Sequence, residues 1–119
     1  MKQQNILSAF RNAFNGLIYF FAQERNGKIQ LGAAMVVIAF AIYFHVSATE
    51  WIVILLCVGA VLSLEMFNSA LEKLCDLIQP GYHPIIKIVK DVSAGAVLLA
   101  SIVSVIIACI IFLPKIFSL

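Results

Sequence analysis

The segment EMFNSALEKLCD at residues 65–76 places three acids and an amide directly after an apolar stretch. Residues 51–64, which read WIVILLCVGAVLSL, contain no charged residue. The polar residues of the segment recur at i, i+3, i+7 and i+11, and they are Glu65, Asn68, Glu72 and Asp76. At about 100° per residue these positions share one narrow face of a helix. The pattern predicts a long helix whose apolar first half continues into a half with a polar stripe.

The depth of Glu65 follows if Trp51 marks one membrane interface. A rise of ~1.5 Å per residue places Glu65 roughly 21 Å further along the helix. The hydrocarbon core is ~30 Å thick, so this carboxyl would lie about 9 Å below the opposite surface. Glu72 would then fall near that surface and Asp76 beyond it. A charge at such depth costs at least ~2.5–3.5 kcal/mol, so Glu65 needs a partner or a purpose.

The composition of the 119-residue chain points to a membrane protein. It is 63% hydrophobic and 12% charged, whereas soluble domains average about 45–50% apolar and about 25% charged. Stretches 29–47, 51–78 and 92–113 are each long enough to cross a bilayer as a helix. No stretch alternates apolar and polar residues with period two, which excludes a barrel. We therefore expect an all-α integral membrane protein with one domain over residues 1–119.

Residues 6–25 predict an amphipathic helix on the membrane surface. Its apolar residues recur at steps of three and four, and they are Ile6, Phe10, Ala13, Leu17 and Phe21. Polar residues such as Arg11 and Asn12 fall on the other face. Gly27 is expected to end this helix before the first span.

The basic residues fix the expected orientation in the membrane. They cluster before the first span and around the 79–90 connection, at Lys2, Arg11, Arg25, Lys28, Lys73, Lys87 and Lys90, and residues 45–50 contain no Lys or Arg. By the positive-inside rule, the N-terminus and the 79–90 connection, with its Pro80-Gly81 turn, are cytoplasmic. We expect a multi-pass protein of the inner (cytoplasmic) membrane. The net charge of +2, without a basic run, argues against a nucleic-acid partner.

Further charged residues are expected at the same cytoplasmic level as the stripe. Lys90 and Asp91 open the third span, and Glu24 ends the surface helix on its bundle-facing side. Carboxylates, an amide and a lysine together suit Mg²⁺ and phosphate groups. Each residue also has a simpler explanation: Glu65 paired with a lysine for packing, Asp76 or Glu24 as a solvated helix end, and Lys90 as a snorkelling cation. No GxxxxGK[ST] phosphate-binding loop is present, so a nucleotide would have to bind at a different kind of site.

Residues 65–76 closely resemble the E-x-x-N-[ST]-A-[IL]-E-x-x-x-D signature of the prokaryotic diacylglycerol kinase and undecaprenol kinase family. KDVSAGAV at residues 90–97 is similar to the family's K-D-x-[AS]-[AS]-x-A-V signature. FRNAFNG at 10–16 and ERN at 24–26 resemble its N-terminal elements. The order and spacing of these motifs agree over nearly the whole chain.

The resemblance implies a lipid kinase that uses MgATP and forms a homotrimer with sites shared between subunits. It implies that Glu65 is the general base towards the lipid hydroxyl and that Glu24 and Glu72 hold the metal. Asn68 would position the reacting groups. Lys90, oriented by Asp91, would contact phosphate.

The resemblance also implies a nucleotide site around the surface helix. His83 would lie near the nucleotide, and Asp76 beside the adenosine. The surface helix would cover the nucleotide, with Asn12 at a position that is often aromatic in the family. Gln30 stands where relatives of the undecaprenol type usually have histidine.

Two other functions are compatible with the sequence. One is a non-catalytic membrane transporter or subunit with the acidic stripe as an ion path, although residues 51–64 carry no acid to continue it. The other is a lipid phosphatase, although no set of nucleophilic histidine and arginine is present. Diacylglycerol and undecaprenol both offer a primary hydroxyl, and the ERN element slightly favours undecaprenol.

Overall fold

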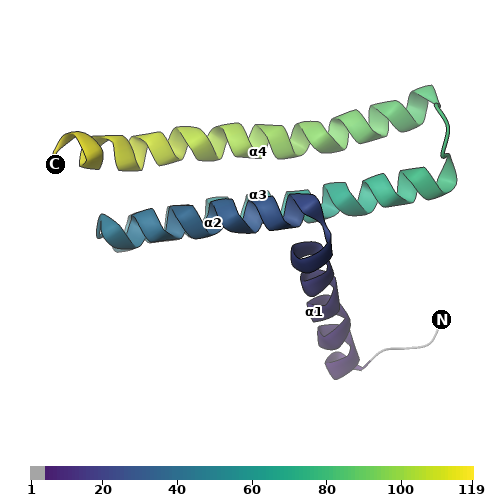
Figure 1. The fold of residues 1–119 in the computed structure, drawn as a ribbon, viewed down its shortest axis with the longest axis horizontal. Coiled ribbons are helices and arrows are strands. Elements are labelled where there is room, and N and C mark those ends of the chain that lie inside the picture. The colour runs from purple at the N-terminus through teal and green to yellow at the C-terminus, as the bar shows by residue number, and fades with distance from the viewer. Residues whose placement is uncertain (1–4) are drawn as a thin grey trace.

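The structure, a computed structural model, describes residues 5–119. Within this range the chain forms four helices: α1 (Ile6–Gln23), α2 (Arg25–Tyr43), α3 (Ala48–Ile78) and α4 (Pro84–Phe117). Helices α2, α3 and α4 run alongside one another, and α1 leaves them at a steep angle (Figure 1). Residues 5–119 contain no strand, which confirms the all-α fold.

Helices α2, α3 and α4 are each long and apolar enough to cross a membrane. With 31 and 34 residues, α3 and α4 exceed the roughly 20 residues that a bilayer needs, so their ends extend past the hydrocarbon. Large apolar side chains point outward all along them, for example Leu56, Phe67 and Leu98. Such a surface is suited to contact with lipid or with other membrane helices.

A cluster of buried apolar residues lies near the 44–47 connection between α2 and α3. Its buried members come from all three spanning helices and the connection, and they are Ala41, Val46, Ile54, Ile111 and Phe112. The Phe112 ring lies 6.0 Å from that of Phe40 and 6.1 Å from that of Phe44. The first pair is edge-on and the second is tilted, and aromatic contacts at such distances add to the packing. These side-chain contacts therefore join the three spanning helices near this connection.

The bend between α1 and α2 is made by Glu24 and not by Gly27. Glu24 leaves the helical conformation, with φ −88° and ψ 133°, and separates the two helices. Gly27 lies inside α2 and is buried. A Cβ added to Gly27 would overlap the backbone carbonyl of Phe20. The expectation that Gly27 ends the surface helix is wrong, because this glycine instead permits the close approach of α1.

The helix ends differ from the expected ranges by several residues. Helix α2 starts earlier than residue 29 and ends earlier than residue 47, because His45 adopts a positive φ of 50° that a helix cannot include. Helix α4 starts at Pro84 instead of residue 92. There His83 accepts the Ile85 N–H as N-cap, and Pro84 occupies the first turn.

Candidate active site

Within the residues that the structure describes, α3 contains two buried polar side chains. Glu65 is 8% exposed and Asn68 is 6% exposed. They lie one turn apart on the bundle-facing side of α3, whereas Phe67 is exposed. The helical spacing of the stripe therefore places its membrane-depth members inside the bundle.

Glu65 is hydrogen-bonded to an amide from the neighbouring span. Gln30 Nε2 of α2 donates to Glu65 Oε1 over 3.1 Å. No ion pair of Glu65 occurs within residues 5–119. A lysine partner that would make this acid a packing device is thus not found in the described chain.

Asn68 keeps a buried oxygen without a partner. Its Oδ1 is inaccessible to solvent and accepts no hydrogen bond from residues 5–119. Such an orphan costs about 1–3 kcal/mol. Buried polar atoms of this kind in folded proteins call for an explanation, such as an ordered water, a bound group or a catalytic role.

Glu24 is held at the bend by a lysine of α3. Lys73 Nζ lies 2.8 Å from Glu24 Oε1, an ion-pair distance. This ion pair is the one polar contact of that buried oxygen in the described range. Lys73 also lies 5.6 Å from the centre of the Tyr19 ring. Lys73 of α3 therefore contacts both the last part of α1 and the bend that follows it.

Near Asp76, at the exposed end of the stripe, lysines form ion pairs both between two helices and within one helix. Lys90 Nζ of α4 contacts Asp76 Oδ1 of α3 at 2.6 Å. Asp91 accepts from Lys87 at 2.7 Å, one turn earlier on α4. In this structure Lys90 is therefore held by Asp76, while Asp91 is engaged by Lys87.

The remaining candidates are more exposed. Glu72 follows Asn68 by one turn on α3, is exposed, and makes no ion pair within the described residues. Asn12 is exposed on α1. His83 lines a shallow cavity of about 210 Å³ with Lys87, Lys90 and Asp91. The structure thus brings Lys90, Asp91 and His83 to one surface hollow and leaves Asn12 outside it.

Two contacts of the candidate site, from Gln30 to Glu65 and from Lys73 to Glu24, are not predicted by the sequence. Gln30 is a polar residue near the start of an otherwise apolar span. Its polar character among apolar neighbours is the feature of the sequence that could indicate a contact inside the bundle. Lys73 lies inside the motif, but its sequence position indicates nothing about Glu24. Both contacts join different helices, so the periodicity of one helix does not reveal them.

The carboxylates are suited to a magnesium ion that is shared with phosphates. No group of three or more His, Cys, Asp or Glu side chains in residues 5–119 could enclose a metal. Mg²⁺ usually binds one or two carboxylates and completes its shell with phosphate oxygens and water. Glu24, whose partner in the described range is Lys73, and Glu72, which makes no ion pair there, are carboxylates of the kind this requires.

Comparison with known proteins identifies the family. The family model of prokaryotic diacylglycerol kinase matches residues 11–112. Undecaprenol kinase of Bacillus subtilis is 38% identical over 107 residues, which cover 90% of this chain and 87% of that protein. Diacylglycerol kinase of Escherichia coli is 30% identical over 105 residues, covering 88% of this chain and 86% of that protein.

A third relative is longer than this chain. Diacylglycerol kinase of Synechocystis sp. is 41% identical over 116 residues, and the match covers 97% of this chain but 66% of that protein. The shared part includes nearly every residue described above. The chain belongs to the prokaryotic diacylglycerol kinase family, and the names of the family and of these relatives indicate a lipid kinase.

Proposed function

We propose that this protein transfers the γ-phosphoryl group of ATP to the primary hydroxyl of a membrane lipid at the cytoplasmic face. The observation that carries this proposal is a buried carboxyl in a spanning helix, Glu65, beside the unsatisfied oxygen of Asn68. A lipid hydroxyl can reach this depth from the bilayer. The nucleotide can approach from the exposed end of the same stripe.

Glu65 is proposed as the general base. As the lipid oxygen attacks the γ-phosphorus, Glu65 takes the hydroxyl proton. The new O–P bond forms while the bond from phosphorus to the β–γ bridging oxygen breaks, and ADP leaves. Asn68 would position the reacting groups from the adjacent turn. A positioned base contributes roughly 10²- to 10⁴-fold to such a rate.

Glu24 and Glu72 are proposed to hold Mg²⁺ together with the ATP phosphates. When bound, this ion neutralises the phosphate charge and fixes the phosphates in place. Lys90 would exchange Asp76 for phosphate oxygens. Phosphoryl transfer depends mainly on such positioning and charge neutralisation, so these residues need no covalent role.

The nucleotide is proposed to lie over the hollow that contains His83 and Asp91, with Asp76 beside the adenosine. Helix α1, with Asn12, would cover it. We further propose a homotrimer in which a neighbouring subunit completes each site. The many outward apolar side chains and the unsatisfied oxygen of Asn68 support this assembly.

The proposed location is the inner membrane with the N-terminus in the cytoplasm. Two features of the sequence support this orientation. The basic residues cluster before the first span and around the 79–90 connection, and residues 45–50 contain no Lys or Arg. The lipid is proposed to be undecaprenol or diacylglycerol. Relatives are named for each of these substrates.

The test is labelled-ATP transfer by the purified protein, with both lipids offered in parallel vesicles. Glu65→Gln removes the base with little change in shape, and Glu50→Gln is the matched control at the far end of α3. We expect Glu65→Gln to lose roughly 10²- to 10⁴-fold in kcat and Glu50→Gln to keep it. Normal transfer by Glu65→Gln would remove Glu65 from this role. Solute transport without ATP consumption would favour a transporter.

A further inference from the structure

The Gln30 side chain contacts the candidate base from another helix. Gln30 lies in the second turn of α2, and its amide reaches across to α3 to donate to Glu65 Oε1 over 3.1 Å. The two residues are separated by 35 positions in the sequence. This contact is therefore set by how α2 packs against α3.

The hydrogen bond occupies one of the two Glu65 oxygens. Oε1 accepts from Gln30, and Oε2 accepts no hydrogen bond within residues 5–119. An amide is neutral, so it orients the carboxylate without cancelling the negative charge, as a lysine would. The arrangement fixes the direction of the carboxylate and leaves one oxygen for another donor.

Gln30 also lines an apolar groove of the bundle. Its side chain lines a groove of about 190 Å³ between α2, α3 and α4, whose other lining residues are mostly apolar, such as Val37, Val61 and Val105. Water competes poorly for hydrogen bonds in such surroundings, so a single donor controls the carboxylate more strongly than it would in water.

We propose that Gln30 is a positioning residue for phosphoryl transfer, which holds Glu65 so that Oε2 receives the proton of the lipid hydroxyl. This inference rests on the proposed role of Glu65 as the base. It predicts an effect on the chemical step, because Gln30 acts through the direction of one carboxylate. The binding of ATP, which is proposed to involve other residues, should change little.

A purely structural role of Gln30 makes a different prediction. Hydrogen bonds between membrane helices contribute little to stability on average. If Gln30 merely joined α2 to α3, any side chain that kept the fold would keep kcat. Rescue of kcat by a donor of similar reach therefore separates positioning from packing.

The experiment compares Gln30→Asn, Gln30→His and the control Gln79→Asn in labelled-ATP transfer. Asparagine keeps the amide and the polarity but is one methylene shorter, so it should fold and fail to reach Glu65. Histidine offers a ring N–H at a reach similar to that of glutamine. Gln79 is exposed in the 79–83 connection, and its side chain makes no hydrogen bond within the described residues.

We expect Gln30→Asn to lose roughly 10- to 100-fold in kcat with the KM for ATP unchanged. Gln30→His should recover most of that loss, and Gln79→Asn should match the unmodified protein. Circular dichroism and thermal unfolding in detergent check that each variant is folded. These measurements use the same vesicles as the Glu65→Gln assay.

Three outcomes would overturn the inference. Unchanged kcat in Gln30→Asn, while Glu65→Gln is inactive, rejects Gln30 as a positioning residue and leaves Glu65 as the base. A loss that histidine does not recover assigns Gln30 to packing. Normal rates in Glu65→Gln would reject both the base and the residue proposed to orient it.

Discussion

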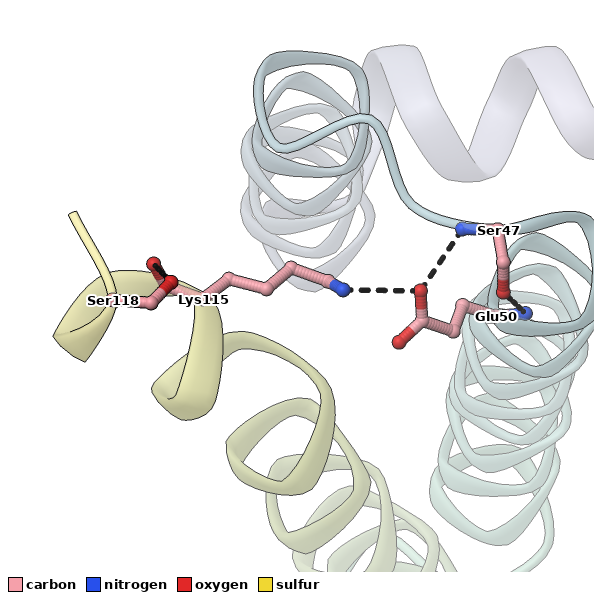
Figure 2. Close-up of polar contacts among 4 residues, drawn as sticks. All are labelled: Ser47, Glu50, Lys115 and Ser118. Atoms are coloured by element: carbon pink, nitrogen blue, oxygen red, sulfur yellow. Dashed lines mark hydrogen bonds and ion pairs between the residues drawn. The ribbon is translucent and has the colours of Figure 1, made fainter.

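Two polar regions of the helix bundle, one at the 44–47 connection and one around Glu65 and Asn68 in the middle of α3, differ in how completely their buried polar groups are paired. Near the 44–47 connection, Glu50 accepts the Ser47 N–H over 2.9 Å and faces Lys115 Nζ at 3.2 Å (Figure 2). The Ser47 hydroxyl in turn accepts the Glu50 N–H over 3.1 Å. We call this set of Ser47, Glu50 and Lys115 the clasp, and its polar groups find their partners within the chain.

The polar groups around Glu65 and Asn68 are less completely paired than those of the clasp. Asn68 Oδ1 is buried without a hydrogen-bond partner in residues 5–119, and Glu24 Oε1 contacts only the Lys73 ammonium there. Glu72 makes no ion pair in the same range. The clasp lies beside the packed residues around Phe112, and the groove lined by Gln30 extends from the Glu65 region to Phe112.

The contrast separates a stabilising cluster from a functional one. A capping box with a terminal ion pair joins two helix ends and requires no ligand. Buried polar atoms that remain unsatisfied reduce stability, so they are expected where another molecule supplies the missing partner. The prediction is that changes near the clasp alter stability and that changes near Glu65 alter catalysis.

The substitution Asn68→Leu should have the largest effect on kcat and tests the difference between the clasp and the region around Glu65. Loss of a positioning amide should reduce kcat by roughly 10²- to 10³-fold. Stability should hold or rise, because the change removes a buried oxygen that has no partner. Labelled-ATP transfer and thermal unfolding of the same preparation measure both. A variant that is less stable than the unmodified protein but keeps its kcat would reverse the assignment of this region.

Phe112→Ala tests the clasp end. The ring is 6% exposed and packs against Phe40 and Phe44, so its removal should cost about 3 kcal/mol of unfolding free energy. The kcat of the folded fraction should remain. Unfolding titrations in mixed detergent measure the loss. A large fall in kcat at full folding would show that the two regions are coupled.

Gly27→Ala tests the bend that positions Glu24. The added methyl would overlap the Phe20 carbonyl, so the variant should lose about 1–3 kcal/mol and also part of its activity, because Glu24 shifts. Gly32→Ala is the matched control on the same helix, since its Cβ would meet nothing within 4 Å. Equal behaviour of the two variants in unfolding and transfer assays would contradict the packing described for Gly27.

Ser47→Ala should give the smallest effect. It removes the N-cap of α3 and half of the capping box, which costs about 1 kcal/mol. Transfer activity should be unchanged, because the clasp is remote from Glu65 along α3. Ser118→Ala is the control, since that hydroxyl donates only to the nearby Lys115 carbonyl. The comparison would be weakened if Ser47→Ala lost activity without losing stability.

Much of the fold follows from the sequence. The apolar stretches predict three spanning helices, and the spacing of Glu65 and Asn68 predicts that both share one face. The helix ends were less predictable. They depend on local events such as the positive φ of His45 and the cap provided by His83, which average hydrophobicity does not report.

The sequence by itself determined the membrane class, the all-α fold, the family and the acidic stripe. These features are periodic or contiguous along one chain segment, so they are readable before folding. The tertiary structure alone decided that Gln30 holds Glu65, that Lys73 faces Glu24, and that Lys90 pairs with Asp76. These contacts join separate helices. They depend on the rotation and register of each helix against its neighbour, which the pattern within a single helix does not specify.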